Sequence, residues 1–240
     1  DIHAGGEDLI FPHHENEIAQ SEAANGKEFS RYWMHNGFLN IDNRKMSKSL
    51  GNFFTVREIS EKYDLQVLRF FMLSAHYRSP LNFSAELMEA AKSGLERIIT
   101  AADRLKFLMG SAKTEDMAET EAEKFAKSAE YVGNFESAMD DDFNTADAIA
   151  AVFDLVKFIN TMTDEDSSKE YLENLFDRLV RLTEVLGIIV DKEDEILDSD
   201  IEALIAERQA ARKEKNFARA DEIRDELLAK GIVLKDTREG

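Results

Sequence analysis

The chain has 240 residues, of which 43% are hydrophobic, two are proline, eleven are glycine and none is cysteine. It is long enough to bury one or more cores. The low proline and glycine contents favour a mainly helical fold, and disulfides are excluded. The net charge of −19 argues against a protein with one large basic face for nucleic acid, and because no run of 18 apolar residues occurs, we expect a cytoplasmic protein without a membrane span.

The negative charge is concentrated in one part of the chain. Residues 111–200 hold 25 acidic and 8 basic side chains, whereas residues 51–110 hold 7 and 8. We expect the acidic part to form a solvated face that repels phosphate. The near-neutral segments can still provide an RNA-binding surface, so the overall charge does not exclude an RNA-binding protein.

The first 17 residues combine glycines with histidines and carboxylates. Residues 1–6 are predicted to be a strand end that leads into a loop, and Pro12 suits the first turn of a helix over residues 13–25. His13 and Glu17 then lie four residues apart on one helix face. An imidazole nitrogen and a carboxylate oxygen at that spacing can bind one zinc ion. The alternative is a polar first turn that the helix dipole favours.

Residues 44–51 read Arg-Lys-Met-Ser-Lys-Ser-Leu-Gly. They lie between an apolar, aromatic run over residues 29–41, which predicts strand structure, and a helical pattern that begins near Thr55. A loop at this place can bring the ammonium groups of Lys45 and Lys48 to a polyphosphate and withdraw them again. The alternative is an ordinary solvated loop.

Two short helices are predicted next. Thr55, with Glu58 three residues later, forms the capping-box pattern of a helix over residues 55–63. Asp64 is expected to cap the following helix, which continues to Ala75. Both predictions depend only on hydrogen bonds between residues close in the chain.

A long helix follows the break at Ser79-Pro80 and begins at Ser84. Apolar residues recur along it at steps of three and four, which is typical of bundle core and not of a cofactor site. This stripe consists of Leu87, Ala91, Leu95, Ile98, Ala102, Leu105 and Met109.

After a loop over residues 110–119, three more helices are predicted: one ending at Met139, one over residues 145–159 and one over residues 167–186. Helices with such short connections predict an antiparallel bundle.

The Asp140-Asp141-Asp142 run between two of these helices has two interpretations. It can be a metal site, or it can mark the end of one helix before the cap of the next. We expect the second, with Asn144 or Thr145 as the cap.

The last part of the chain begins with an acidic linker over residues 188–199. Residues 200–215 and 217–230 are predicted to form a helical hairpin, followed by a short strand at residues 232–235. Basic side chains gather on and near the first of these helices, either as a solvated face or as an RNA contact. They are Arg208, Arg212, Lys213 and Lys215.

Several motifs together carry a family resemblance. They are residues 5–17 (Gly-Gly-Glu-Asp-Leu-Ile-Phe-Pro-His-His-Glu-Asn-Glu), 32–38 (Tyr-Trp-Met-His-Asn-Gly-Phe), 45–49 (Lys-Met-Ser-Lys-Ser), 76–83 (His-Tyr-Arg-Ser-Pro-Leu-Asn-Phe) and 139–145 (Met-Asp-Asp-Asp-Phe-Asn-Thr). With them the chain resembles the cysteinyl-tRNA synthetases, which are class I aminoacyl-tRNA synthetases, through essentially all of its length.

The resemblance implies a mainly α fold. The C-terminal remnant of a Rossmann-type catalytic domain is followed by an antiparallel helical bundle and a small α+β C-terminal subdomain. The implied boundaries are 1–52 for the catalytic part, 53–84 for a helical connector, 85–190 for a DALR-type tRNA-binding bundle and 200–240 for a truncated anticodon-recognition subdomain. Because the family carries another ATP motif and two cysteine zinc ligands upstream, we expect a C-terminal fragment that is inactive alone.

The implied reaction is the ATP-dependent activation of L-cysteine and its transfer to the 3′ end of cysteine tRNA, with magnesium accompanying ATP. Lys48 and Lys45 are then the catalytic residues. The ATP-binding residues implied by the resemblance are Lys45, Met46, Ser47, Lys48 and Ser49. We expect a monomer.

The resemblance also implies one zinc ion, held by His13, Glu17 and two upstream cysteines. The ion accepts the substrate thiolate and so selects sulfur over oxygen by softness. Asp8 is the expected partner of the substrate ammonium and His3 of its carboxylate. His14 is expected to lie behind the ligands or at the surface.

Two other functions remain open. A related ligase activates cysteine in the same way but transfers it to an amino-sugar. The continuation of the chain into residues 200–240 favours tRNA, because a small acceptor needs no anticodon-reading appendage. From a different class, the chain can be an RNA-binding or interaction module without catalysis.

Overall fold

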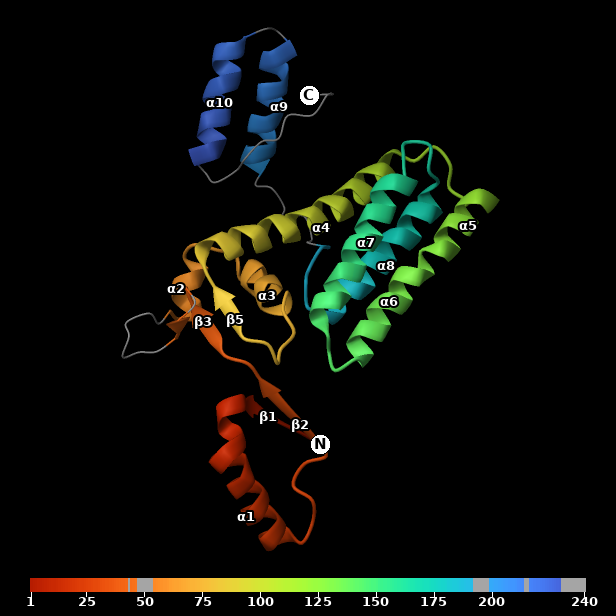
Figure 1. The fold of residues 1–240 in the computed structure, drawn as a ribbon. Coiled ribbons are helices and arrows are strands. Elements are labelled where there is room, and N and C mark those ends of the chain that lie inside the picture. The colour runs from red at the N-terminus through yellow and green to blue at the C-terminus, as the bar shows by residue number, and fades with distance from the viewer. Residues whose placement is uncertain (43, 47–53, 192–198, 214–215, 230–240) are drawn as a thin grey trace. The chain divides into compact units, whose positions relative to one another are not determined.

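A computed structural model describes residues 1–42, 44–46, 54–191, 199–213 and 216–229. The chain forms two compact units, residues 1–191 and 192–240. The strands of the first unit are β1 (Ile2–Gly6), β2 (Tyr32–Asn36), β3 (Leu39–Ile41), β4 (Arg44–Lys45) and β5 (Leu81–Phe83). Its helices are α1 (Glu15–Asn25), α2 (Val56–Ser60), α3 (Leu65–Leu73), α4 (Ala85–Ser111), α5 (Glu119–Lys127), α6 (Ala129–Asp140), α7 (Thr145–Met162) and α8 (Lys169–Val185). The predicted mainly helical fold is confirmed (Figure 1).

The first unit begins with a βαβ arrangement. β1 and β2 pair in parallel, with His3 beside Trp33, and α1 connects them (Figure 1). α1 begins at Glu15, two residues later than predicted, because the backbone before it is kinked: Phe11 is extended, with φ −130° and ψ 132°, so residues 10–14 do not form a regular helical turn. It ends where Gly26 takes a left-handed φ of 62°, a conformation that glycine adopts without steric cost.

A second sheet follows directly. β3 is its central strand, antiparallel to β4 and parallel to β5. The strand predicted over residues 29–41 is therefore two strands in two sheets. Gly37 lies between them, and its N–H donates to the Tyr77 carbonyl oxygen at 2.8 Å. A Cβ on Gly37 would lie 2.6 Å from the Ser79 carbonyl carbon, so this close approach requires glycine.

The predicted helix starts of α2, α3 and α4 are confirmed. Thr55 Oγ1 accepts a hydrogen bond from the Glu58 N–H at 3.2 Å, and Glu58 Oε2 accepts one from the Thr55 N–H at 2.7 Å. The hydrogen bond from the Thr55 N–H holds the pKa of Glu58 below its usual value. The side chains of Asp64 and Ser84 accept from N–H groups in the first turns of α3 and α4.

The core of the first unit lies around α4, which packs against α3, α7 and α8. Five residues of the predicted stripe are buried, namely Ala91, Leu95, Ile98, Ala102 and Leu105. Leu87 is 43% exposed, so its prediction was wrong, and Met88 is fully buried instead. Leu87 lies four residues and Met88 three residues before Ala91, so helix spacing allows either to join the buried face. Met88 is the one that packs in the core with Phe70 and Phe71.

One predicted helix is broken in two. The helix expected to end at Met139 consists of α5 and α6, which meet at Ser128. The Arg178 guanidinium of α8 lies 3.8 Å from the centroid of the Phe125 ring and donates to the Phe125 carbonyl oxygen at 2.9 Å. It also donates to the Ser128 hydroxyl. Burial lowers the pKa of Arg178. These contacts across the bundle stabilise the break, and no local pattern predicts them.

A buried carboxylate joins α5 to the start of α8. Glu121 accepts hydrogen bonds from the Ser168 N–H at 2.9 Å, the Ser168 hydroxyl at 2.6 Å and the Ala118 N–H at 3.0 Å. Burial by itself would raise the pKa of Glu121, but these hydrogen bonds outweigh it and lower the pKa. The ionised form of Glu121 therefore stabilises the fold.

We expect Glu121→Gln to lower the free energy of unfolding at pH 7 by about 1–3 kcal/mol, because the new amide would face backbone and hydroxyl donors. A lowered folded-state pKa contributes stability above the unfolded value of 4.5, and this contribution is lost as the pH falls through the folded pKa. The difference between Glu121→Gln and the unsubstituted chain should therefore shrink below pH 4.5 in urea titrations. Glu123→Gln, on the exposed side of the same helix, is the control. A difference that stays constant down to pH 3 would contradict the assignment.

The cap predicted for α7 is confirmed at Asn144. Its Oδ1 accepts a hydrogen bond from the Asp147 N–H at 3.2 Å. The preceding aspartate run ends α6 at Asp140, as expected for a helix end.

The second unit contains the predicted helical hairpin, formed by α9 (Ser199–Lys213) and α10 (Phe217–Ala229). Among the described side chains of this unit, Ala211, Ala220, Ile223 and Leu227 are buried. Arg219 Nε bonds Glu207 Oε1 across the hairpin at 2.9 Å. The strand predicted at residues 232–235 lies outside the described residues, as do the Lys213 side chain and Lys215.

Candidate active site

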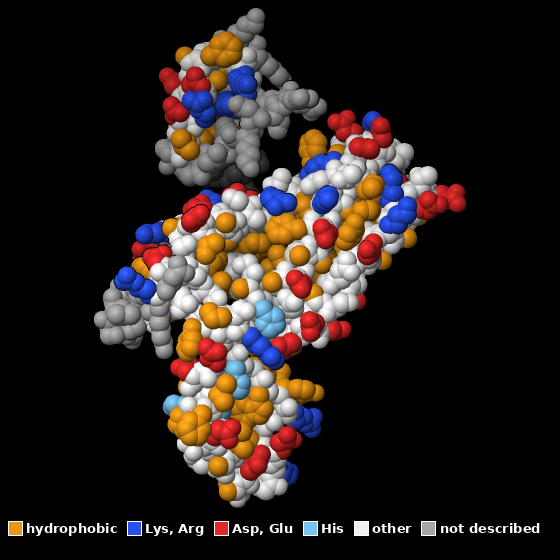
Figure 2. Space-filling view, in the orientation of Figure 1, with side chains coloured by type: hydrophobic (Ala, Val, Ile, Leu, Met, Phe, Trp, Pro, Cys, Tyr) orange, Lys and Arg blue, Asp and Glu red, His pale blue; other side chains and the backbone are white. Residues whose placement is uncertain are grey.

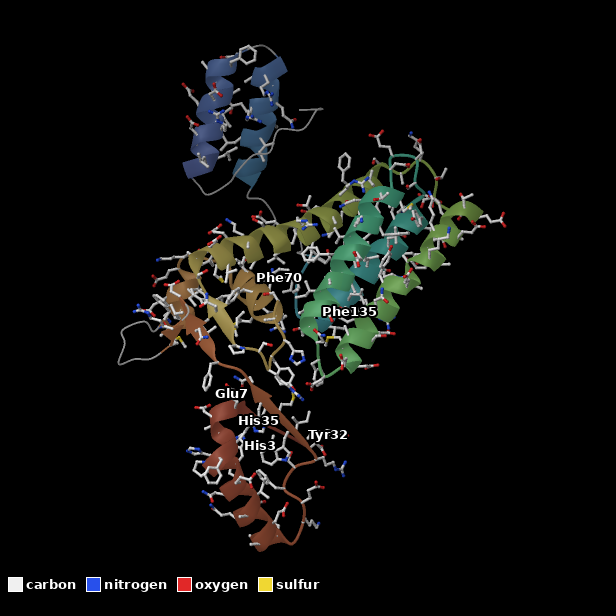
Figure 3. All side chains as sticks on the ribbon, viewed as in Figure 1. His3, Glu7, Tyr32, His35, Phe70 and Phe135 are labelled. Carbon is white, nitrogen blue, oxygen red and sulfur yellow. The ribbon has the colours of Figure 1, made fainter. Side chains whose placement is uncertain are left out.

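Aromatic and histidine side chains gather where β1 and β2 pair (Figures 2 and 3). The centroid of the His3 ring lies 4.9 Å from that of His14, 4.9 Å from that of Trp33 and 5.0 Å from that of Phe29. The His14 and His35 rings are 5.0 Å apart. The parallel register places His3 beside Trp33, and His14 reaches them from the turn before α1. Several imidazoles are thus assembled in one place.

His14 is the buried member of this group, with 5% of its surface exposed. A Cβ on Gly5 would lie 2.9 Å from its ring carbon Cε1, so the glycine lets the imidazole lie directly against β1. Nδ1 of His14 is 2.8 Å from Nε2 of His35. One of these two nitrogens must donate and the other accept, which fixes their protonation relative to each other.

A carboxylate completes the group. Glu17 Oε2 lies 2.8 Å from Nε2 of His3. Among the residues that the structure describes, His3, His14 and Glu17 each offer one ligand atom, and these atoms lie within 4.8 Å of one another. Two imidazoles and one carboxylate are a donor set that three-ligand zinc sites use.

The predicted zinc ligands are only partly brought together. Glu17 belongs to the group, whereas His13 is exposed and lies outside it. The spacing argument assumed a regular helix from Pro12, but α1 begins only at Glu15, and Phe11 directly before Pro12 has an extended backbone. His14, expected behind the ligands or at the surface, belongs to the group. The role of His13 stays a prediction.

Of the two predicted substrate contacts, His3 lies within β1 and Asp8 follows it. Asp8 is exposed in the 3-10 turn Glu7–Leu9, and its Oδ1 would lie 2.5 Å from a Cβ on Gly6. His3 is half-buried and bonded to Glu17. Neither observation tests their role, which stays a prediction.

The start of the lysine motif (residues 45–49) is anchored on the second sheet. Lys45 ends β4 and pairs with Asn40 of β3. The Met46 N–H donates to the Leu39 carbonyl oxygen at 3.4 Å. Ser47, Lys48 and Ser49 lie outside the described residues, so their predicted contacts with ATP stay predictions.

One network was not predicted. The Asp142 carboxylate, in the turn between α6 and α7, accepts from the Tyr77 hydroxyl at 2.8 Å and pairs with Arg78 Nη2 at 2.7 Å. Arg78 Nε donates to the Tyr77 hydroxyl at 3.1 Å. The two motifs that meet here are visible in the sequence, but their contact is not, because Tyr77 and Asp142 are 65 residues apart.

Arg78 also lines a pocket of about 330 Å³. The other lining residues are Glu7, Ile10, Trp33 and His35. Glu7 follows β1 and His35 lies near the end of β2, and Figure 3 shows both at this edge. The pocket therefore lies at the carboxyl ends of two parallel strands, where open α/β sheets bind ligands.

No helix among the described residues combines the length and apolar character that a membrane span needs.

Three family models match the chain in succession. The class I (C) tRNA synthetase catalytic domain matches residues 1–93, the DALR domain matches residues 134–190, and the cysteinyl-tRNA ligase anticodon binding domain matches residues 194–240.

Solved structures of class I synthetases share the fold. The LeuRS–tRNA–LeuAMS ternary complex of Agrobacterium radiobacter K84 has a TM-score of 0.63 at 18% identity and covers 81% of this chain and 28% of that one. Mycobacterium tuberculosis methionyl-tRNA synthetase bound by methionyl-adenylate has a TM-score of 0.58 at 20% identity, covering 78% of this chain and 41% of that one. At these identities the likeness concerns the fold alone.

Curated relatives are much more similar. The cysteine–tRNA ligase of Lachnospira eligens is 69% identical over 240 residues, which are all of this chain and 51% of the relative. That of Clostridioides difficile is 55% identical over all of this chain and 52% of the relative. The chain thus spans about half the length of these relatives. It belongs to the cysteinyl-tRNA synthetase family.

Proposed function

We propose that the protein containing this chain is a cysteine–tRNA ligase, which activates L-cysteine with ATP and transfers it to the 3′ end of cysteine tRNA. The observation that carries the proposal is the 69% identity to a cysteine–tRNA ligase along all 240 residues. The successive matches to the catalytic, DALR and anticodon-binding models support it further. An anticodon-binding region favours tRNA over an amino-sugar acceptor and favours catalysis over a bare RNA-binding module.

In this reaction the cysteine carboxylate attacks the α-phosphate of ATP, and charge spreads over the phosphate oxygens. Lys48 contacts these oxygens most strongly in the transition state, and Lys45 assists it. Met46, Ser47 and Ser49 complete the ATP-binding segment, and magnesium accompanies the nucleotide. The pairing of Lys45 with Asn40 of β3 supports the proposal that the start of the motif is anchored on the sheet while the following residues reach ATP.

A zinc ion is proposed for recognition of the substrate thiol, with His13 and Glu17 as ligands beside two cysteines from outside these 240 residues. The region fits a metal, because imidazole and carboxylate donors converge within 4.8 Å around Glu17. When bound, zinc accepts a thiolate in preference to a hydroxyl. Glu17 belongs to this converging group, while His13 is exposed and lies outside it.

The substrate is held by this chain's own groups. Asp8 faces the cysteine ammonium and His3 its carboxylate in our proposal. The bond from His3 to Glu17 keeps the imidazole oriented toward the zinc ligands. An oriented imidazole can place one N–H on the substrate carboxylate and, at the same time, exclude water from it.

We assign the chain to four proposed parts: 1–52 catalytic, 53–84 connecting, 85–190 tRNA-binding and 200–240 anticodon-recognising. We further propose that the ligase is a cytoplasmic monomer. Within the bundle we expect the tRNA contact at its near-neutral first segment, residues 85–110, because the acidic side chains of residues 111–200 repel phosphate.

The test uses the full-length protein that contains this chain. We expect cysteine-dependent ATP–pyrophosphate exchange and charging of cysteine tRNA, with serine and amino-sugars as controls for substrate and acceptor. Exchange with cysteine but transfer only to an amino-sugar would show that the acceptor is the amino-sugar and not tRNA. Tight binding of tRNA without any exchange would show that the protein is an RNA-binding module without catalysis.

A further inference from the structure

The turn between α6 and α7 has an unusual backbone. Asp142 and Phe143 take φ values of 56° and 55°, both in the left-handed region that non-glycine residues rarely adopt. Backbone hydrogen bonds hold the turn in place, from Phe143 N to Met139 O and from Asn144 N to Ala138 O, each at 3.1 Å. Such a conformation persists where the surroundings determine it and is often found at functional positions.

The turn directs one carboxylate at two side chains. Asp142 Oδ1 accepts from the Tyr77 hydroxyl, and Asp142 Oδ2 pairs with Arg78 Nη2, while Arg78 Nε donates to the same hydroxyl. Nε2 of His76 lies 3.8 Å from Asp142 Oδ2, and its ring stacks on Tyr77 with centroids 4.9 Å apart. The Arg78 guanidinium is therefore held by the hydroxyl of the neighbouring Tyr77 and by the Asp142 carboxylate from the α6–α7 turn.

The same segment is tied to the other side of the unit. The Tyr77 carbonyl oxygen accepts from the Gly37 N–H, directly after β2, and the Ser79 carbonyl lies where a side chain on Gly37 would be. Residues 76–79 thus lie between the carboxyl end of β2 and the helical bundle. A displacement of the α6–α7 turn would reach the pocket at β2 through this segment.

Arg78 retains donors for a ligand. A guanidinium carries five N–H groups, and the Arg78 side chain is 61% exposed although two of its nitrogens are bonded. It lines the pocket with Trp33 and His35 of β2. A planar guanidinium in fixed orientation matches the oxygens of a phosphate group.

We infer that Asp142 is a positioning residue that acts through Arg78, holding this guanidinium at the pocket so that it contacts a phosphate oxygen of the reactants. The inference rests on the proposed function, which supplies two phosphate sources, the nucleotide and the 3′ end of the tRNA. The helical bundle then contributes to the reaction through one carboxylate and not only by its shape.

The variants are Asp142→Asn, Arg78→Gln and both together in the full-length protein that contains this chain. Asparagine keeps the left-handed backbone of position 142, since Asn tolerates positive φ, but removes the charge. Asp140→Asn, at the exposed end of α6, removes the same charge without touching Arg78 and is the matched control.

We expect Asp142→Asn and Arg78→Gln each to lower the catalytic rate by roughly 10- to 100-fold, the size of a lost hydrogen bond to a charged group, with the KM for cysteine unchanged. The double variant should be no slower than Arg78→Gln alone, because both substitutions remove the same contact. A loss in pyrophosphate exchange assigns the phosphate to the nucleotide. A loss only in single-turnover transfer from preformed adenylate assigns it to the tRNA.

The inference is overturned if the rates of both variants match those of Asp140→Asn in exchange and in transfer, or if the losses in the double variant are additive. A fall in melting temperature alone, with unchanged rates, would show a purely structural contact and would count equally against it. Failure of the proposed function is distinct, because then the unsubstituted protein itself shows no exchange with cysteine.

If the unsubstituted protein shows no exchange, a fluorescence measurement on the 240-residue chain still tests whether Asp142 holds Arg78 at the pocket. Trp33 is its sole tryptophan and lines the pocket with Arg78. If Asp142 positions Arg78 there, Asp142→Asn and Arg78→Gln increase acrylamide quenching of the Trp33 fluorescence and Asp140→Asn does not. Equal quenching in all variants would overturn the inference without reference to activity.

Discussion

Lys48→Ala is expected to lower the rate of cysteinyl-adenylate formation by about 100- to 1,000-fold, the range found when one donor to developing transition-state charge is removed. The dissociation constant for ATP should change by much less. The reason is that the ammonium contact strengthens as charge spreads over the phosphates, so its loss affects the transition state more than the ground state. Pre-steady-state measurements of adenylate formation at several ATP concentrations separate the two quantities.

The control for Lys48 is Lys92→Ala, which removes the same charge from an exposed position on α4. It should change neither quantity. Lys45→Ala should have an intermediate effect, because Lys45 is expected to assist Lys48 and its backbone is part of β4. If Lys48→Ala weakened ATP binding as much as it slowed the reaction, Lys48 would merely bind ATP.

His13→Ala in the full-length protein is expected to lower zinc affinity by more than the roughly 10- to 100-fold that follows loss of an outer hydrogen-bond partner, because a ligand itself is removed. Discrimination between cysteine and serine should fall to about 100-fold or less, since a pocket without a thiolate-accepting metal separates such similar side chains poorly. Elemental analysis gives the zinc content, and activation assays with each amino acid give the discrimination. Because His13 is exposed, the His13→Ala variant and the unsubstituted protein should have the same melting temperature in the presence of chelator.

His14→Ala provides the competing arm. His14 is buried against Gly5 and bonded to His35, so its removal should lower stability even without metal. Glu17→Gln should lower zinc affinity under either assignment, because Glu17 belongs to both proposed ligand sets. Retention of stoichiometric zinc in His13→Ala, together with its loss in His14→Ala, would transfer the ligand role from His13 to His14.

Predictions from the sequence succeeded where the partners are close in the chain. The capping box of Thr55 and Glu58 and the caps at Asp64, Ser84 and Asn144 each depend on a side chain and a backbone N–H two or three residues away. Such hydrogen bonds form whatever the rest of the fold does. The spacing of apolar residues along α4 likewise predicted most of its buried face.

Predictions failed where a distant contact decides the local structure. The break between α5 and α6 is stabilised by Arg178, 50 residues beyond Ser128. The division of one predicted strand into β2 and β3 depends on the close approach of residues 77–79 to Gly37. Helix periodicity assigns Leu87 and Met88 almost equally well to the buried face of α4, and only packing decides that Met88 is the buried one.

The sequence by itself determined the family, the lysine motif over residues 45–49 and the concentration of histidines and carboxylates in the first 17 residues. The tertiary structure alone decided which of those groups converge, namely His3, His14 and Glu17, because their positions depend on strand pairing and on the kinked backbone before α1. It alone also brought Asp142 to Arg78. Contacts between side chains so far apart in sequence arise only when the elements that carry them pack, since no local pattern fixes the distance between two helices or the direction of a turn.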